Sequence, residues 1–179
     1  MGNILLGVTG SIAAYKAADI ANRLTKDGHA VDVVMTRNAR EFVAPLTFST
    51  LTKRPVYTDS FADVPEYDVE HIGLAKGAEI VVIAPATANI IGKVAGGIAD
   101  DLLSTVVMAA AGYGKRIVVC PAMNTAMYGN PIVRANIDKL TELGYAFVEP
   151  RESVLACGDL GRGALADTDA ITSAITAAL

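Results

Sequence analysis

The sequence predicts an α/β fold, a three-layer sandwich of the Rossmann or flavodoxin-like kind in which helices cover both faces of a parallel sheet. Short apolar, β-branched runs alternate with helix-like segments along the whole chain of 179 residues. The inner residues of these runs are almost uniformly apolar, as expected for strands that are covered on both faces. The β-α-β order favours parallel strands with right-handed crossovers. The length predicts a single domain over residues 1–179.

The expected elements follow one another in order. Strands are predicted at Asn3–Thr9, Ala30–Thr36, Glu79–Ala84, Arg116–Cys120 and Ala146–Val148. Apolar residues at helical spacing fill the gap between the first two, and Gly28 is expected to end that helix. Further helices are predicted at Leu102–Ala111, Ile132–Leu143 and Ala166–Leu179. Residues 52–70 and 150–165 are expected to be long irregular segments, which are usually functional or mobile in a compact domain. The three glycines within 150–165 are expected to permit a mobile flap.

Composition narrows the possible functions. A net charge of −4 and a pI near 5.1 argue against a nucleic-acid partner, which requires a basic face. The sequence contains no apolar run long enough for a transmembrane helix and no signal-peptide pattern, so no membrane partner is expected. Two cysteines cannot build a disulfide framework, which favours a cytoplasmic location with reduced thiols. The hydrophobic fraction of 52% suggests that some apolar surface covers subunit interfaces.

The turn Gly7-Val8-Thr9-Gly10-Ser11-Ile12 is a candidate phosphate site. It would end the first strand and open the first helix, so backbone N–H groups and the helix dipole could face an anion. The same residues also fit an ordinary tight turn between a strand and a helix. The dinucleotide pattern GxGxxG is absent, and the second strand ends in Thr36-Arg37 without a ribose-binding acid. A mononucleotide is therefore favoured over NAD.

A second candidate site follows the fourth predicted strand, at the edge where open α/β folds bind ligands. The run Pro121-Ala122-Met123-Asn124-Thr125-Ala126-Met127-Tyr128 resembles the PxMNxxMW signature of the homo-oligomeric flavin-containing cysteine decarboxylases, with Tyr128 in place of the usual Trp. Three further segments match that family: Gly10 to Lys16, His71 ahead of Ala84 to Asn89, and Ala156 to Asp159. The resemblance extends from about residue 3 to about residue 170.

The resemblance implies FMN as the cofactor and no metal. The residues that would bind FMN are Gly10, Ser11, Ile12, Thr36, Thr87, Ala88, Asn89, Ile90, Ala122 and Met123. Ile90 departs from the family's commoner Thr, which leaves a backbone contact but not a side-chain one. The resemblance also implies trimers, in some cases packed into dodecamers, with FMN at subunit contacts.

The same resemblance implies a catalytic set of His71, Asn124 and Cys157. His71 would act as a base or orient the thiol, Asn124 would hold the substrate carboxylate, and Cys157 would donate a proton. The residues that would contact the substrate are Asn124, Met127, Ala156, Cys157 and Gly158. From the residues alone, a lone histidine before a strand, such as His71, is more often a cap or packing residue than a catalyst, and Asp100 could simply cap a helix. Cys120, inside a strand-like run, fits a buried structural thiol.

The implied reaction removes the carboxyl group of a cysteine amide. FMN oxidises the thiol-bearing carbon to a thioaldehyde, carbon dioxide leaves, and the enethiolate is reduced. The implied substrate is phosphopantothenoylcysteine, with phosphopantetheine as the product in coenzyme A biosynthesis. The chain has no room for a phosphopantothenate–cysteine ligase domain, so a separate ligase is expected as a pathway partner.

Three alternatives remain open at this point. A peptide decarboxylase acting on a C-terminal cysteine would share FMN, His71 and Asn124. A flavin prenyltransferase would not need Asn124 or Cys157 in these motifs. A non-enzymatic regulatory flavoprotein of the same fold would be indicated by loss of a catalytic residue, whereas here all three are present.

Overall fold

The core is a six-stranded parallel sheet in the order β3-β2-β1-β4-β5-β6, in a computed structural model that describes residues 1–58, 70–156 and 158–179. The strands are β1 (Asn3–Val8), β2 (Ala30–Met35), β3 (Val56–Tyr57), β4 (Ile80–Ala86), β5 (Arg116–Pro121) and β6 (Ala146–Phe147). The five predicted strands are confirmed. The short edge strand β3 was not predicted, because its two residues lie in a segment expected to be irregular.

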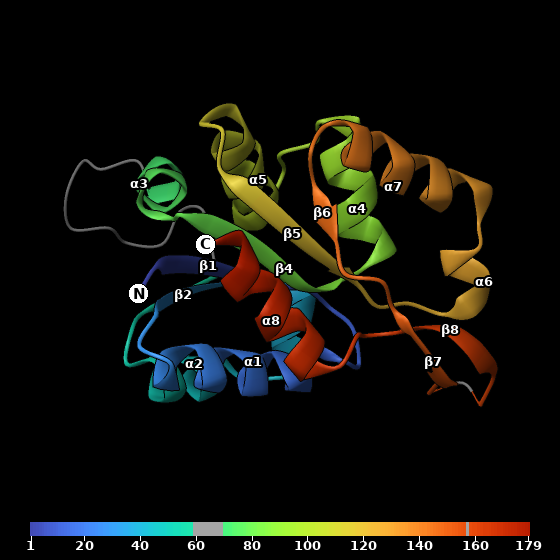
Figure 1. Ribbon diagram of the computed structural model, residues 1–179, viewed down its shortest axis with the longest axis horizontal. Helices are drawn as coiled ribbons and strands as arrows, with labels where there is room; N and C mark the ends of the chain where they lie inside the picture. Colours follow the sequence, from blue (N-terminus) through green and yellow to red (C-terminus); the bar gives the residue numbers. More distant parts are fainter. Residues whose placement is uncertain (59–69, 157) are drawn as a thin grey trace.

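Helices cover both faces of this sheet, which confirms the predicted three-layer architecture (Figure 1). One face is covered by α1 (Ala14–Lys26), α2 (Pro45–Thr52) and α8 (Thr168–Ala178). The other is covered by α3 (Glu70–Gly77), α4 (Ala88–Gly96), α5 (Leu102–Gly112) and α7 (Pro131–Glu142). Two short helical segments, η1 (Arg37–Glu41) and α6 (Thr125–Tyr128), follow β2 and β5. Helices α2, α3, α4 and α6 were not predicted.

Local sequence explains where the predicted helices begin and end. In α1, Ala17, Ile20 and Leu24 are fully buried at helical spacing, and the next turn ends at Gly28 with φ +88°, a conformation that favours glycine. In α7, the Asn130 side chain accepts the N–H of Ile132 at 2.9 Å, and proline follows at the first helical position. Both boundaries agree with the sequence-based prediction.

Strand β4 shows why the sheet strands are apolar on both sides. All seven of its residues are buried. Ile80 and Val82 belong to the core beneath α1 and α8, whereas Val81 and Ile83 belong to the core beneath α5. Because successive side chains alternate between faces, one strand contributes to both cores.

Strands β2 and β3 are added on one side of β1, whereas β4, β5 and β6 are added on the other, so the order of the strands reverses between β1 and β4. Strand β1 pairs with β2 on one side and with β4 on the other. The loops that follow β1 and β4 therefore lead away to opposite faces, and a crevice opens between them at the carboxyl ends of the strands. Open α/β folds bind ligands at such a point.

Residues 150–165 are not irregular, and this part of the prediction is wrong. They form an antiparallel hairpin of β7 (Arg151–Val154) and β8 (Leu160–Ala164), which projects beyond the carboxyl edge of the sheet (Figure 1). The glycines that suggested a flexible loop lie largely inside β8, where close packing explains them, as shown below.

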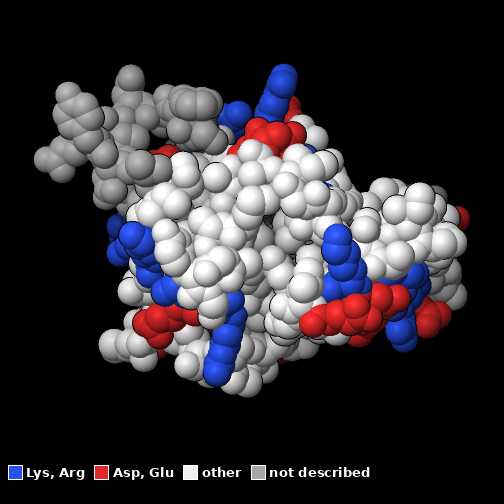
Figure 2. Space-filling model, turned by 90° about the horizontal axis from the view of Figure 1, so that it is seen from above, with Lys and Arg blue, Asp and Glu red and all other residues white. Residues whose placement is uncertain are grey.

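Seen from the side of α4 and α5, the molecule presents an area with few charged side chains, next to a band of mixed charge (Figure 2). Exposed apolar residues of this region include Ile98, Met108 and Tyr113, each more than two fifths exposed. Among the described residues, no helix combines the length and apolar character needed to cross a bilayer.

Gly7 is expected to be needed for the contact between β1 and α5. A Cβ at Gly7 would lie 2.5 Å from Cδ1 of Leu103, which is 1% exposed. Gly7→Ala should therefore lower the free energy of unfolding by about 1–3 kcal/mol, measured by urea denaturation. Gly112→Ala is the matched control, because a Cβ there meets nothing within 4 Å, and it should not destabilise. The Gly7→Ala cost should shrink in a Leu103→Ala background, and a cost that is additive instead would contradict the contact.

Candidate functional site

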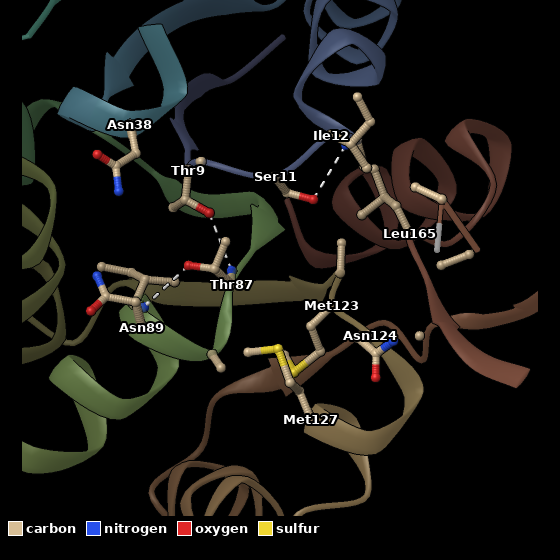
Figure 3. A pocket seen from close by; sticks show the side chains of 18 of the residues that line it. Thr9, Ser11, Ile12, Asn38, Thr87, Asn89, Met123, Asn124, Met127 and Leu165 are labelled. Atoms are coloured by element: carbon tan, nitrogen blue, oxygen red, sulfur yellow. Dashed lines mark hydrogen bonds between the residues drawn. The ribbon is translucent and has the colours of Figure 1, made fainter. Parts of the chain in front are cut away.

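A cavity of about 1020 Å³ opens at the carboxyl edge of the sheet. Its walls come from the segments that follow β1, β2, β4 and β5, with the β7–β8 hairpin along one side (Figure 3). This volume lies at the upper end of the range for small-molecule sites, enough for a mononucleotide-sized ligand and a second molecule. The phosphate-loop candidate and the Asn124 motif, separated by more than a hundred residues, both line it.

The segment after β1 forms the wall beside α1. The Ser11 hydroxyl accepts the N–H of Ala13 at 3.2 Å, and α1 begins without a capping side chain and without an acidic residue in its first turn. A helix N-terminus of this kind favours an anion. Gly10 is required here, because a Cβ would lie 2.4 Å from Cβ of Asn38. Thr36 lines the same wall and caps η1 by accepting the N–H of Ala39 at 3.3 Å.

Thr9 connects the first wall to the second. It is 2% exposed, and its hydroxyl donates to the carbonyl of Pro85 at 2.7 Å and accepts the N–H of Thr87 at 3.1 Å. Thr87 in turn caps α4 by accepting the N–H of Ile90 at 3.5 Å (Figure 3). Thr9 was predicted as part of the candidate phosphate turn, but no role for its side chain in joining the two loops was predicted. The feature of the sequence that could have indicated this role is a polar residue at the end of an otherwise apolar strand.

The second wall of the cavity consists of Thr87, Ala88, Asn89 and Ile90. Ile90 is 1% exposed, so it contributes apolar surface rather than a donor. Deeper in the sheet, Ala122 joins this wall by donating its N–H to the carbonyl of Ala86 at 3.0 Å. The result is an apolar slot with polar groups at its ends.

Asn124 lies at the opposite side of the cavity from Ser11 (Figure 3). Its Oδ1 accepts the N–H of Ala126 at 2.8 Å and so caps α6, while its Nδ2 approaches Oδ2 of Asp159 at 3.5 Å. Capping fixes the orientation of the amide, with the NH₂ group directed toward the hairpin. Met123 and Met127 lie beside it, and Met127 is 48% exposed. This arrangement suits an amide that donates to a carboxylate.

The hairpin is held against this motif by close backbone contact. The N–H of Met123 donates to the carbonyl of Gly163 at 2.9 Å. A Cβ at Gly163 would lie 2.2 Å from the carbonyl oxygen of Met123, and one at Gly161 would lie 2.6 Å from Oγ1 of Thr125. These glycines therefore permit strand β8 to approach α6. They were interpreted from the sequence as a sign of flexibility.

Ala156, at the hairpin turn, lines the cavity, and Gly158 follows with φ +90°. Cys157, predicted as a proton donor, lies outside the described residues. Cys120 is fully buried in β5, and burial raises the pKa of its thiol to about 12. Cys120 therefore matches the structural thiol expected from the sequence.

His71 is not brought to the cavity. It lies in the first turn of α3 and is partly exposed, and among the described residues it does not belong to the cavity lining. The three residues predicted to be catalytic are therefore not seen together within one chain, and their roles stay predictions.

Lys93 forms a charged corner of the cavity. Its ammonium group contacts Asp100 at 2.6 Å and Asp101 at 2.7 Å. Asp101, not Asp100, caps α5, in a reciprocal capping box with Ser104, so the suggested cap at Asp100 is corrected. Asp100 instead pairs with Lys93. Burial alone would raise the pKa of Asp101, but the hydrogen bonds from Lys93 and Ser104 outweigh it and lower that pKa below its ordinary value.

Comparison with known proteins identifies the class. The family described as Flavoprotein matches residues 2–179, nearly the whole chain. The chain therefore belongs to the flavoprotein family. It is 47% identical over 172 residues to a probable phosphopantothenoylcysteine decarboxylase of Streptococcus mutans, covering 96% of each chain. It is 46% identical over 169 residues to the coenzyme A biosynthesis bifunctional protein CoaBC of Bacillus subtilis, covering 94% of this chain but 41% of that protein.

Solved structures agree with the fold and the family. A PPC decarboxylase variant complexed with pantothenoylaminoethenethiol superposes with a TM-score of 0.88 at 35% identity, covering 98% of this chain and 97% of the other. The FMN binding protein AtHal3 superposes with a TM-score of 0.84 at 35% identity, covering 98% and 95%. The peptidyl-cysteine decarboxylase EpiD superposes with a TM-score of 0.82 at 26% identity, covering 98% of both chains.

The charged corner predicts how stability depends on pH. Because the folded-state pKa of Asp101 is lowered, its stabilising effect is present above the unfolded-state pKa of about 4 and is lost as pH falls through the folded-state pKa. Asp101→Asn, which keeps a capping residue, should lower the free energy of unfolding by about 1 kcal/mol at neutral pH. The difference from the wild type should vanish in acid.

Asp138→Asn is the matched control, since Asp138 is an exposed residue of α7. It should show no comparable difference at either pH. Urea denaturation at a series of pH values measures both variants. An Asp101→Asn deficit that persists unchanged in acid would mean that the carboxylate charge is not the cause.

Proposed function

We propose that this protein decarboxylates phosphopantothenoylcysteine to phosphopantetheine with FMN as its cofactor, a step of coenzyme A biosynthesis. The observation that carries the proposal is the meeting of the Gly10–Ile12 loop and the Asn124 motif in one cavity. The near full-length similarity to a probable phosphopantothenoylcysteine decarboxylase supports the substrate. The cytoplasm, where thiols stay reduced, is the proposed location, and a separate ligase is the proposed pathway partner.

The residues present fit FMN. The uncapped start of α1 with Gly10 and Ser11 offers donors for the phosphate, and Thr36 lies beside them. The apolar slot between Thr87 and Ile90 on one side and Ala122 and Met123 on the other suits a flat ring system. Lys16, Arg37 and Arg151 also line the cavity, and these cations suit a site that must hold an anionic cofactor and an anionic substrate.

Direct loss of carbon dioxide from a cysteine amide would leave an unstabilised carbanion. When bound, FMN supplies the missing electron sink by taking up and returning an electron pair. The protein must then hold the substrate carboxylate, exclude water and move a proton. Asn124 is placed to do the first, because its capped amide directs its NH₂ group toward the hairpin side of the cavity. The hairpin lines this side and would limit access of water.

Two residues would handle protons. Cys157, which stands between Ala156 and Gly158 in the sequence, would donate a proton to the carbon that has lost carbon dioxide. His71 would act near the substrate thiol as a base or an orienting group. Since His71 does not line the cavity of its own chain, it could do so only from a second copy of the chain.

The alternatives are supported less. The peptidyl-cysteine decarboxylase is 26% identical to this chain, whereas the probable phosphopantothenoylcysteine decarboxylase of Streptococcus mutans is 47% identical over 172 residues. A peptide with a C-terminal cysteine is therefore the second candidate substrate. A flavin prenyltransferase would not need Asn124 capped and aimed into the cavity, and a purely regulatory flavoprotein would not need the three predicted catalytic residues.

Cys157→Ser should separate the steps of the reaction. A serine hydroxyl is a far weaker acid than a thiol, so protonation at neutral pH should slow sharply. The variant should still release carbon dioxide from phosphopantothenoylcysteine but accumulate the oxidised enethiol, detected by mass spectrometry. Asn124→Asp should block even the first oxidation, because it sets a carboxylate against that of the substrate.

Phosphopantetheine formation by Cys157→Ser at the wild-type rate would show that the cysteine is structural. Conversion of a peptide with a C-terminal cysteine in preference to phosphopantothenoylcysteine would move the substrate assignment to the second candidate.

We further propose a trimer, or a dodecamer built from trimers, in which His71 of one chain completes the site of the next. The sparsely charged area over α4 and α5 supports such contacts (Figure 2). His71→Asn and Asn124→Asp should each be inactive alone. Mixed oligomers should regain activity, because about a quarter of the sites in randomly assorted chains would carry neither change. Full activity in a stable monomer, measured by sedimentation, would contradict this arrangement.

A further inference from the structure

Tyr128, at the end of α6, forms a side-chain contact with the approach to the hairpin. The residue is 6% exposed, and its hydroxyl donates to Oε2 of Glu149 at 2.7 Å. Glu149 lies in the connection between β6 and β7, two residues before Arg151. This hydrogen bond therefore joins the helix that follows Asn124 to the first strand of the hairpin.

Two arginines surround this pair. Nη1 of Arg162, on β8, lies 3.8 Å from the same oxygen of Glu149, and the guanidinium of Arg134, on α7, lies 4.9 Å from the centre of the Tyr128 ring. Burial, and then the hydrogen bond to Glu149, raise the pKa of Tyr128, so the phenol stays protonated as a donor at neutral pH. The Arg162 contact is exposed and weak, so the phenol is the principal partner of Glu149.

The hairpin contributes cavity-lining residues at Arg151, Ser153 and Val154. Its second strand is tied to the Asn124 motif by the backbone bond between Met123 and Gly163. The bond between Tyr128 and Glu149 ties the base of its first strand to the same short helix. Both ends of the hairpin are thus held against residues 123–128, where the Asn124 side chain caps the start of α6.

We propose that Tyr128 and Glu149 are positioning residues, whose hydrogen bond holds the β7–β8 hairpin in register with Asn124 and so determines how well the cavity closes on its substrate. The role in substrate binding rests on the proposed function. The anchoring of the hairpin does not.

The test uses the full-length protein loaded with FMN and a Tyr128→Phe variant, which keeps the buried ring. Hydrogen–deuterium exchange over residues 151–164 should accelerate by about tenfold when the charge-assisted hydrogen bond is lost. The KM for phosphopantothenoylcysteine should rise by about tenfold, with a smaller fall in kcat, since the cavity closes less well. FMN content should stay that of the wild type, because the phosphate loop and α4 are not touched.

A double-mutant cycle shows whether the two residues act together. Glu149→Ala should reproduce the Tyr128→Phe effects, and the double variant should be no worse than either single one. Tyr128→Trp, which restores an N–H donor on a buried ring, should recover part of the loss. Arg162→Gln should change KM by less than about twofold, as expected for an exposed ion pair.

Tyr145→Phe is the matched control, because it makes the same chemical change at a half-buried tyrosine beyond α7. It should alter neither exchange nor KM. Unchanged exchange in the hairpin of Tyr128→Phe, or additive effects in the double variant, would overturn the proposal. If the wild type does not decarboxylate phosphopantothenoylcysteine at all, the proposed function fails, while the exchange measurement still decides whether the anchor exists.

Discussion

The two hydrogen bonds of the Thr9 hydroxyl are the constraint on which the site depends. Donation to Pro85 and acceptance from Thr87 join the loops that leave β1 and β4 at the point where the sheet changes its direction of growth. A crevice at this point is a consequence of the topology, but its shape is not. By fixing the start of α4 against the end of β1, Thr9 places the phosphate loop and the apolar wall on the same cavity.

The opposite side of the cavity depends on α6 in a similar way. This helix has only four residues, yet three interactions fix it: the Asn124 cap at its start, the hydrogen bond of the Tyr128 hydroxyl at its end, and the backbone contact of Gly163 with the segment just before it. A short helix contributes little stability by itself. Its orientation is set by these neighbours, and they in turn set the direction of the amide that we assign to the substrate carboxylate.

The sequence was most informative where structure is local. Buried β-branched runs predicted five strands of the sheet, and Asn130-Pro131 predicted the start of α7. It was least informative where contacts are distant along the chain. The glycines at 161 and 163 suggested mobility, but they allow β8 to approach α6, a contact between segments some forty residues apart. The sequence did not distinguish the adjacent carboxylates of Asp100 and Asp101. In the structure Asp100 pairs with Lys93, whereas Asp101 accepts the N–H of Ser104 and caps α5.

The central claim is that the cavity at the carboxyl edge holds FMN with its phosphate at Gly10 and Ser11. The visible absorption spectrum of the purified protein, compared with that of Ser11→Glu, tests this claim most directly. The account predicts a yellow wild type with one FMN per chain, and a variant that loses the cofactor because like charge lies beside the phosphate. A colourless wild-type protein that cannot be reconstituted with FMN would contradict it.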